Sequence, residues 1–296
     1  MSKDDFPIML ASPFKEIDRI NFPCIAQTKA DGMRANIIVK DGGVQVFSRN
    51  GKVMNLFGQF DVFANLFDRA VVLDGELLVK EDGKVLDRKT GNGILHKAVV
   101  GTISPEEAKK VSIVLWDIIF HEDWQKGKFA MTSDKRLELL QNIKATPVHS
   151  IIDTRVVTSL DDAQELFKEK LALGEEGIIL KNTNHIWENK RSKQIVKMKE
   201  VIESDLKIIG FAQGTGKASG MLGALQCQNA DGSIRVDVGT GFTDDNRKDI
   251  WAKREELLNT IVTIKHNGTI TRKDSNTKSL FLPVFVELRP DKSEAD

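Results

Sequence analysis

Cysteine is scarce in this sequence: only Cys24 and Cys227 occur among its 296 residues. Two thiols so far apart along the chain form neither a disulfide framework nor a cluster of cysteine metal ligands. A reducing, intracellular compartment suits this composition best. The cysteine content therefore excludes a disulfide-bonded secreted scaffold and predicts a cytoplasmic protein.

Long apolar runs are also missing. No stretch approaches the roughly 20 apolar residues that a membrane-spanning helix needs. The first ten residues, MSKDDFPIML, are too short and too acidic for a secretory signal peptide. These absences predict a soluble protein without a membrane partner.

The chain has no excess charge of either sign, because Lys plus Arg and Asp plus Glu both number 43. A neutral total gives no support for a wholly basic nucleic-acid binder, but it is compatible with a local basic face. The length allows one large domain or two ordinary ones.

Extended segments dominate the first two thirds of the chain. They are rich in β-branched and apolar residues and are bounded by Gly, Asp or Lys. The Lys-Asp-Gly-Gly stretch at 40–43 predicts a hairpin between the first two. The predicted strands are 35–40, 44–48, 71–79, 111–119 and 177–181.

Helices are predicted from apolar spacing and from capping residues. Leu, Phe, Phe and Phe at 56, 60, 63 and 67 repeat with helical spacing and predict a helix over 56–67. Ser159 and Gly174 bracket a second helix, and Ser104 followed by Pro105 begins a short one at 104–110. A fourth helix is predicted over 243–258, after Thr243.

Short strands follow a change of composition near residues 200–206. Four or five of them with one helix in about 90 residues are typical of a small oligonucleotide-binding (OB) β-barrel. The predicted strands are 206–214, 223–230, 233–239, 261–267 and 280–288. The sequence therefore predicts one domain over 1–201 and another over 202–296.

Lys29 lies in the stretch QTKADGMR, between two extended segments. A lysine amine is a potential covalent nucleophile when it is unprotonated, and neighbouring positive charge, a metal ion or desolvation favours that form. A four-residue pattern is common, so an ordinary surface lysine in a turn is the alternative interpretation.

Acidic residues recur within apolar strands. Asp74 and Glu76 alternate in LDGEL and would share a strand face, which is costly unless a cation, a hydroxyl or water meets them. A solvated turn is the alternative. Glu176 precedes a further apolar run that ends at Lys181.

Three other features carry charge or an aromatic ring. Lys197 and Lys199 lie two apart, so they would share a strand face and repel each other unless an anion lies between them; an exposed edge strand is the alternative. Trp116 serves either core packing or base stacking. The ending RPDK at 289–292 is a charged cluster or a frayed tail. Together these motifs describe a pocket for a nucleoside triphosphate with a metal ion.

The set resembles the covalent nucleotidyltransferase superfamily of DNA ligases, RNA ligases and mRNA capping enzymes. KADGMR resembles the nucleophile motif KxDGxR, and the other motifs follow in order across nearly the whole chain. The stretches RKTGNGILHKA at 88–98 and GTGFTDDNR at 239–247 are similar to compact ATP-dependent DNA ligases of phages and bacteria. The ordered motifs are SRNG at 48–51, LDGE at 73–76, LWD at 115–117, EGIILK at 176–181, VKMK at 196–199 and RPDK at 289–292.

The resemblance implies an α+β fold. A nucleotidyltransferase domain of ATP-grasp-like antiparallel sheets with helices would be followed by a small OB-fold β-barrel. The implied activity is ATP-dependent DNA ligation, which seals a 3′-hydroxyl and a 5′-phosphate at a nick. It would proceed through a lysyl-AMP and then an adenylated DNA. The segment 200–206 would be the hinge between the domains.

The resemblance also implies roles for individual residues. Lys29 would attack the α-phosphorus of ATP and carry AMP covalently, with Asp31, Lys197 and Lys199 also catalytic. Glu76 and Glu176 would contact Mg²⁺ or Mn²⁺, since Mg²⁺ suits carboxylate and phosphate oxygens. The nucleotide would be bound by Gln27, Thr28, Lys29, Arg34, Arg49, Glu76, Trp116, Glu176, Lys197, Lys199, Arg289 and Lys292.

Nicked double-stranded DNA is the implied partner of a protein expected to be a monomer. Contacts would be local, non-specific and salt-sensitive. A solvated loop is the alternative for 181–193. The DNA-binding residues expected are Arg34, Arg49, Arg88, Lys89, Lys97, Lys190, Arg191 and Lys193, of which Arg88, Lys89 and Lys97 would flank a glycine-rich loop.

Other activities within the superfamily remain as alternatives. An mRNA capping guanylyltransferase would use GTP, and an RNA ligase would join RNA ends. A catalytically inactive nucleic-acid-binding protein with an OB module would never acquire a covalent nucleotide.

Overall fold

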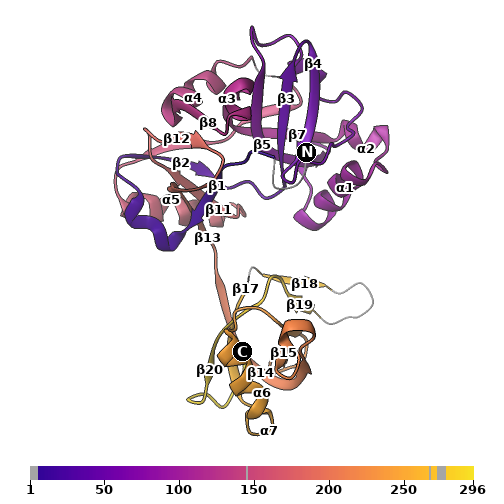
Figure 1. Ribbon diagram of the computed structural model, residues 1–296, viewed down its shortest axis with the longest axis vertical. Helices are drawn as coiled ribbons and strands as arrows, with labels where there is room; N and C mark the ends of the chain where they lie inside the picture. The colour runs from indigo at the N-terminus through magenta and orange to yellow at the C-terminus, as the bar shows by residue number, and fades with distance from the viewer. Residues whose placement is uncertain (1–5, 145, 267, 272–277) are drawn as a thin grey trace. The chain divides into compact units, whose positions relative to one another are not determined.

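The computed structural model describes residues 6–144, 146–266, 268–271 and 278–296. The chain divides into two compact units, residues 1–199 and 200–296. This division lies close to the boundary expected between 201 and 202. Each unit has sheets and a hydrophobic core of its own (Figure 1).

The first unit contains two larger sheets, and most of their strand pairs are antiparallel. The parallel pairs are β1 with β13 and β7 with β9. One sheet has the order β4-β3-β5-β7-β9, with β6 on β5: Gly43–Ser48, Met33–Lys40, Val71–Glu81, Val111–Phe120, His149–Ile151 and Lys84–Val85. The other has the order β1-β13-β11-β2-β10: Leu10–Pro13, Arg191–Lys199, Gly177–Lys181, Cys24–Thr28 and Thr154–Val157. A two-stranded sheet pairs Ile186–Glu188 (β12) with Lys128–Thr132 (β8).

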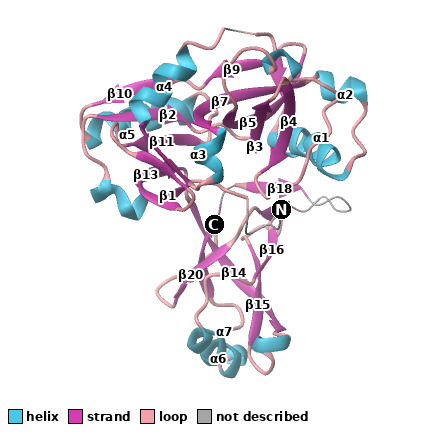
Figure 2. Cartoon of the chain, turned by 45° about the horizontal axis from the view of Figure 1, so that its top comes forward, coloured by secondary structure: helices cyan, strands magenta, loops and turns pink. Residues whose placement is uncertain are grey.

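Helices cover these sheets (Figure 2). α1 packs on β5, α4 packs on β7, and α5 packs on β10 and β11. The helices are Arg88–Val100 (α1), Pro105–Lys109 (α2), His121–Gln125 (α3), Ser133–Gln141 (α4) and Leu160–Ala172 (α5), with 3₁₀ turns at Phe14–Arg19 (η1) and Asp61–Phe63 (η2). None of the helices in the described part of the chain has the length and apolar character required to span a bilayer.

The second unit is built around a five-stranded antiparallel sheet. Its order is β16-β15-β14-β17-β20: Arg235–Val238, Leu222–Gln228, Ile202–Gln213, Ile261–His266 and Val284–Arg289. The remaining elements are Gly216–Ala218 (η3), Asp244–Ala252 (α6), Arg254–Leu257 (α7), Thr269–Thr271 (β18) and Lys278–Leu280 (β19). Of the segment 200–206 that was expected to be a hinge, residues 202–206 form the start of β14.

Several local predictions are confirmed. All five strands predicted in the first two thirds are present, and Asp41 and Gly42 make the hairpin turn with φ of 50° and 72°. Ser159 caps α5 by accepting a hydrogen bond from the Asp162 backbone N–H, and Ser104 caps α2 in a reciprocal pair with Glu107. These elements were predictable because the caps act within one turn of the chain.

The helix predicted over 56–67 is wrong, because only the 3₁₀ turn at 61–63 forms there. Phe57 and Gly58 both have positive φ, at 49° and 74°, which no α-helix accommodates. Leu56, Phe60 and Phe63 are nevertheless buried. The spacing therefore predicted burial correctly and the element incorrectly.

The glycine-rich loop predicted around 88–98 is also wrong, because these residues form helix α1. Asp87 caps the helix by accepting hydrogen bonds from the backbone N–H groups of Lys89 and Thr90. Gly91 is buried against β5, and an added Cβ there would be in ordinary contact with Val79 at 3.9 Å. The single helix predicted over 243–258 is divided at Lys253, whose ψ of 15° separates α6 from α7.

Candidate active site

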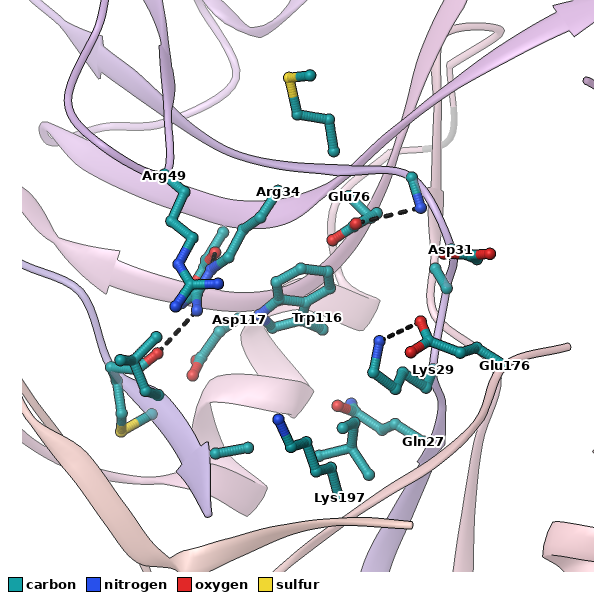
Figure 3. A pocket seen from close by; sticks show the side chains of 18 of the residues that line it. Gln27, Lys29, Asp31, Arg34, Arg49, Glu76, Trp116, Asp117, Glu176 and Lys197 are labelled. Carbon is teal, nitrogen blue, oxygen red and sulfur yellow. Dashed lines mark hydrogen bonds and ion pairs between the residues drawn. The ribbon is translucent and has the colours of Figure 1, made fainter. Parts of the chain in front are cut away.

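The candidate active site is a cavity of about 600 Å³ in the first unit, lined by strands of both larger sheets. Such a volume is within the range of small-molecule sites in proteins. Its lining includes the predicted residues Gln27, Thr28, Lys29, Asp31, Arg34, Arg49, Glu76, Trp116, Glu176 and Lys197. Most of the motif residues of the first unit therefore meet at one place (Figure 3).

Lys29 lies directly after β2, in the turn that leads to β3. Its ammonium group forms an ion pair with Glu176, and the two side chains point toward each other in Figure 3. Its backbone N–H donates to the Gly177 carbonyl oxygen at 2.8 Å. Two contacts with the start of β11 therefore fix the lysine at the cavity.

Glu76 reaches the same region from β5. Its carboxylate accepts a hydrogen bond from the Gly32 backbone N–H at 3.2 Å. Burial raises the pKa of Glu76 to about 7, although Lys29 and the Gly32 hydrogen bond oppose this shift. Glu76 is half-buried, and a partly desolvated carboxylate is stabilised in its charged form by a nearby cation.

Lys197 extends from β13 into the cavity. Desolvation lowers the pKa of Lys197, and the charges of Lys199 and Lys29 lower it further. Met198 points the other way, into the core. Lys197 lines the cavity, whereas Lys199, two residues further along β13, is not among the described residues that line it.

Trp116 is half-buried in β7 and borders the cavity. The Arg34 guanidinium carbon lies 5.5 Å from the centroid of its ring, within the range of a cation–π contact. Arg34 is held by two hydrogen bonds to Asp74, at 2.9 and 2.6 Å, and by one to the Met9 carbonyl oxygen at 2.8 Å. One face of the tryptophan is therefore next to a fixed cation.

Gln27 and Thr28 supply polar groups from β2. The Gln27 amide nitrogen donates to the Thr154 hydroxyl at 3.3 Å, and its side chain is only 3% exposed. The Thr28 hydroxyl is buried without a hydrogen-bond partner in the described chain. Orphaned buried hydroxyls are rare, and this one borders a cavity that a ligand could fill.

The residues expected to bind DNA are spread over several elements, and most of them are engaged in internal contacts. Arg34, Arg49, Arg88 and Arg191 line the cavity, whereas Lys89, Lys97, Lys190 and Lys193 do not. The internal partners in this group include Asp31 for Arg88, Glu107 for Lys97, Glu188 for Lys190, the Ala11 carbonyl for Arg191 and Glu16 for Lys193.

The RPDK ending folds back within the second unit. Arg289 is hydrogen-bonded twice to Asp291 and lies 3.6 Å from the Asp205 carboxylate. Lys292 also pairs with Asp205. The cluster is thus tied to β14, and it is not a frayed tail.

A buried network beside the cavity was not predicted. Arg136 of α4 is 1% exposed and is bonded to the Asp117 carboxylate at 2.6 and 3.1 Å. Burial lowers the pKa of Lys181 to about 8, and the charge of Arg136 contributes. Lys181 and Asp117 both line the cavity. Nothing in the local sequence around Arg136 distinguishes it from an exposed helical arginine.

His185 completes this network and gives it a pH dependence. Its Nε2 lies 3.2 Å from an Arg136 donor and its Nδ1 lies 2.8 Å from the Asn182 carbonyl oxygen, so the ring is neutral with its proton on Nδ1. Burial and then the charge of Arg136 lower the pKa of His185 to about 4 from 6.5. The unfolded state therefore binds the extra proton between these values, and stability falls as the pH falls through that window.

We expect this histidine to cost the first unit about 3 kcal/mol of stability between pH 6.5 and pH 4. Urea unfolding followed by tryptophan fluorescence suits the test, because Trp116, Trp124 and Trp187 all lie in that unit. His185→Gln should show a shallower decline with acidification, whereas His96→Gln, at an exposed position, should follow the parent protein. Equal slopes for His185→Gln and the parent would contradict the assignment.

The chain is similar to known DNA ligases along most of its length. Residues 8–199 match the family described as "ATP dependent DNA ligase domain" and residues 213–289 match the one described as "DNA ligase OB-like domain". The DNA ligase of Enterobacteria phage T4 is 31% identical over 344 residues, which cover 98% of this chain and 70% of that protein. The DNA ligase of Methanothrix thermoacetophila is 31% identical and covers 81% of this chain, with 44% of its own length matched.

Two solved structures resemble this chain in fold along nearly its whole length. One described as "Pmar-Lig_PreS3" has a TM-score of 0.83 at 27% identity and covers 96% of this chain and 68% of its own. Another, described as "DNA binding with a minimal scaffold: Structure-function analysis of Lig E DNA ligases", has a TM-score of 0.74 at 21% identity, covering 96% and 99%. At that identity the second likeness shows the fold alone.

Proposed function

Because the chain belongs to the ATP-dependent DNA ligase family, we propose that it seals nicks in duplex DNA through an adenylate carried on Lys29. The observation that carries the proposal is the convergence of Lys29, Glu176, Glu76 and Lys197 on one cavity. The resemblance drawn from the sequence motifs, and the α+β fold with an OB-like domain, agree with the family found.

The first step is attack by the Lys29 amine on the α-phosphorus of ATP. A phosphorus–nitrogen bond forms, the bond to the bridging oxygen of pyrophosphate breaks, and the amine proton is released. Such transfers depend on positioning and on neutralising the phosphate charge. Lys197 supplies positive charge beside Lys29, and Lys199 adds charge next to Lys197.

The base and sugar are held by the remaining cavity residues. Trp116 offers a ring for stacking on adenine, and Gln27 and Thr28 offer an amide and an unpartnered hydroxyl. Arg34 and Arg49 border the same space, where a ribose or the 5′-phosphate of the nick would lie. Arg289 and Lys292 of the second unit would orient the pyrophosphate during this step.

A divalent cation fits the carboxylates of the cavity. Glu76 and Glu176 both line the cavity and would offer carboxylate oxygens to a cation. Within the described residues no three potential ligands form a closed metal site, so water and phosphate oxygens would complete the shell of Mg²⁺ or Mn²⁺. The cation would supply neutralisation of phosphate charge.

In the next steps AMP moves from Lys29 to the 5′-phosphate of the nick, and the 3′-hydroxyl then displaces AMP. The phosphates of the duplex would be contacted by Arg34, Arg49, Arg88, Lys89, Lys97, Lys190, Arg191 and Lys193. The protein would act as a monomer and, as its phage relatives suggest, in the bacterial cytosol or a phage-infected cell.

The direct test incubates the protein, stripped of bound AMP, with Mg²⁺ and α-phosphate-labelled ATP or GTP, followed by nicked DNA or nicked RNA. We expect covalent label from ATP alone and transfer of AMP to the 5′-phosphate of nicked DNA. Label from GTP would favour a capping guanylyltransferase, and transfer only to RNA would favour an RNA ligase. No label from either nucleotide would contradict the covalent mechanism and favour an OB-containing binding protein.

A further inference from the structure

Arg88 is the first residue of helix α1, and its side chain reaches the turn that carries the nucleophile. Its Nη1 lies 2.7 Å from Oδ1 of Asp31. Asp87 fixes the start of the helix by capping two backbone N–H groups. The pair therefore connects a helix, through one side chain, to the residue two positions after Lys29. Both partners border the cavity.

Asp31 is surrounded by charges from three elements. Arg88 comes from α1, Glu176 directly precedes β11, and Lys29 directly follows β2, and all three act on the Asp31 carboxyl group. Burial raises the pKa of Asp31, the negative charge of the nearby Glu176 raises it further, and Glu176 itself pairs with Lys29. Two carboxylates thus lie next to each other, with Asp31 paired to Arg88 and Glu176 paired to Lys29.

We propose that Arg88 is a positioning residue for nucleophilic attack by Lys29, and that it acts by holding Asp31 away from the lysine. This inference rests on the proposed function and goes beyond any contact that Arg88 makes with DNA. Lys29 must leave its counterion to reach the α-phosphorus, and one carboxylate partner, Glu176, already holds it. When Arg88 is removed, Asp31 turns toward Lys29, the neighbouring cation, and becomes a second carboxylate that competes with the phosphate for the amine.

The adenylation step separates this role from DNA binding, because it needs ATP and no DNA. We expect Arg88→Ala to slow self-adenylation roughly fivefold in the absence of DNA, and Arg88→Lys to restore most of the rate. Lys84→Ala removes an exposed lysine of β6 and should match the parent protein. In an Asp31→Asn background the further change of Arg88 to alanine should have almost no effect, since the carboxylate it restrains is gone.

Two results would overturn the inference. One is an adenylation rate for Arg88→Ala equal to that of the parent, with only the sealing of nicked DNA weakened, which would leave Arg88 as a phosphate contact. The other is an equal loss from Arg88→Ala in the parent and in the Asp31→Asn background. Failure of the parent protein to become adenylated would instead contradict the proposed function. Circular dichroism of each variant checks that α1 is retained.

Discussion

Replacing Lys29 by alanine is expected to abolish self-adenylation while preserving the sealing of a nick that already carries AMP. The adenylation rate should fall by about 10⁴-fold or more, because no other amine occupies the nucleophile's position. Sealing of pre-adenylated DNA requires attack by the DNA 3′-hydroxyl and involves no new bond to Lys29. That rate should stay within about tenfold of the parent's. Single-turnover assays with labelled ATP and with labelled adenylated DNA measure the two steps separately.

A matched control is Lys40→Ala, at the exposed end of β3. It should leave both rates unchanged. If Lys29→Ala still acquired label from ATP, another residue would be the nucleophile. If it lost both steps equally while remaining folded, Lys29 would have a role in nick binding that its position in the turn does not explain.

Much of the candidate site could be predicted from the sequence because its residues belong to short motifs. Lys29 and Asp31 are neighbours in the chain, and the alternation of Asp74 and Glu76 follows from the geometry of a single strand. The pairing of the strands within each sheet brings these motifs together, since β2 pairs with β11, and β3 pairs with β5. The resemblance to a family supplied that association, which no local pattern contains.

The rest could not be predicted because it depends on contacts between distant residues. Arg136 looks like any polar residue of a helix, and only the meeting of α4 with β7 makes it the partner of Asp117. The glycines of α1 favoured a loop by propensity, but the Asp87 cap and packing on β5 outweigh that preference. The apolar residues of 56–67 are buried from a series of turns, and their helical spacing did not distinguish these turns from a helix.

Replacing Gly177 by alanine is expected to destabilise the first unit and to disable adenylation together. Its φ of 144° is a conformation that other residues rarely adopt, and an added Cβ would lie 2.2 Å from the Met198 carbonyl oxygen. The backbone must shift, although Gly177 pairs with Lys199 across β11 and β13 and its carbonyl accepts the Lys29 N–H. We expect a loss of about 2–4 kcal/mol in the free energy of unfolding.

The effect on activity follows from the same shift, because Gly177 is covalently next to Glu176 and hydrogen-bonded to Lys29. A displacement on the order of 1 Å at reacting groups costs about 10²-fold in rate. Gly174→Ala is the matched control: its φ is 81°, but an added Cβ there meets nothing within 4 Å. It should cost about 1 kcal/mol of stability and leave adenylation unchanged. Urea unfolding and the ATP-labelling assay test both variants. Equal behaviour of the two would mean that the positive-φ backbone alone accounts for the effect and that the close contact with β13 has no part in holding the nucleophile.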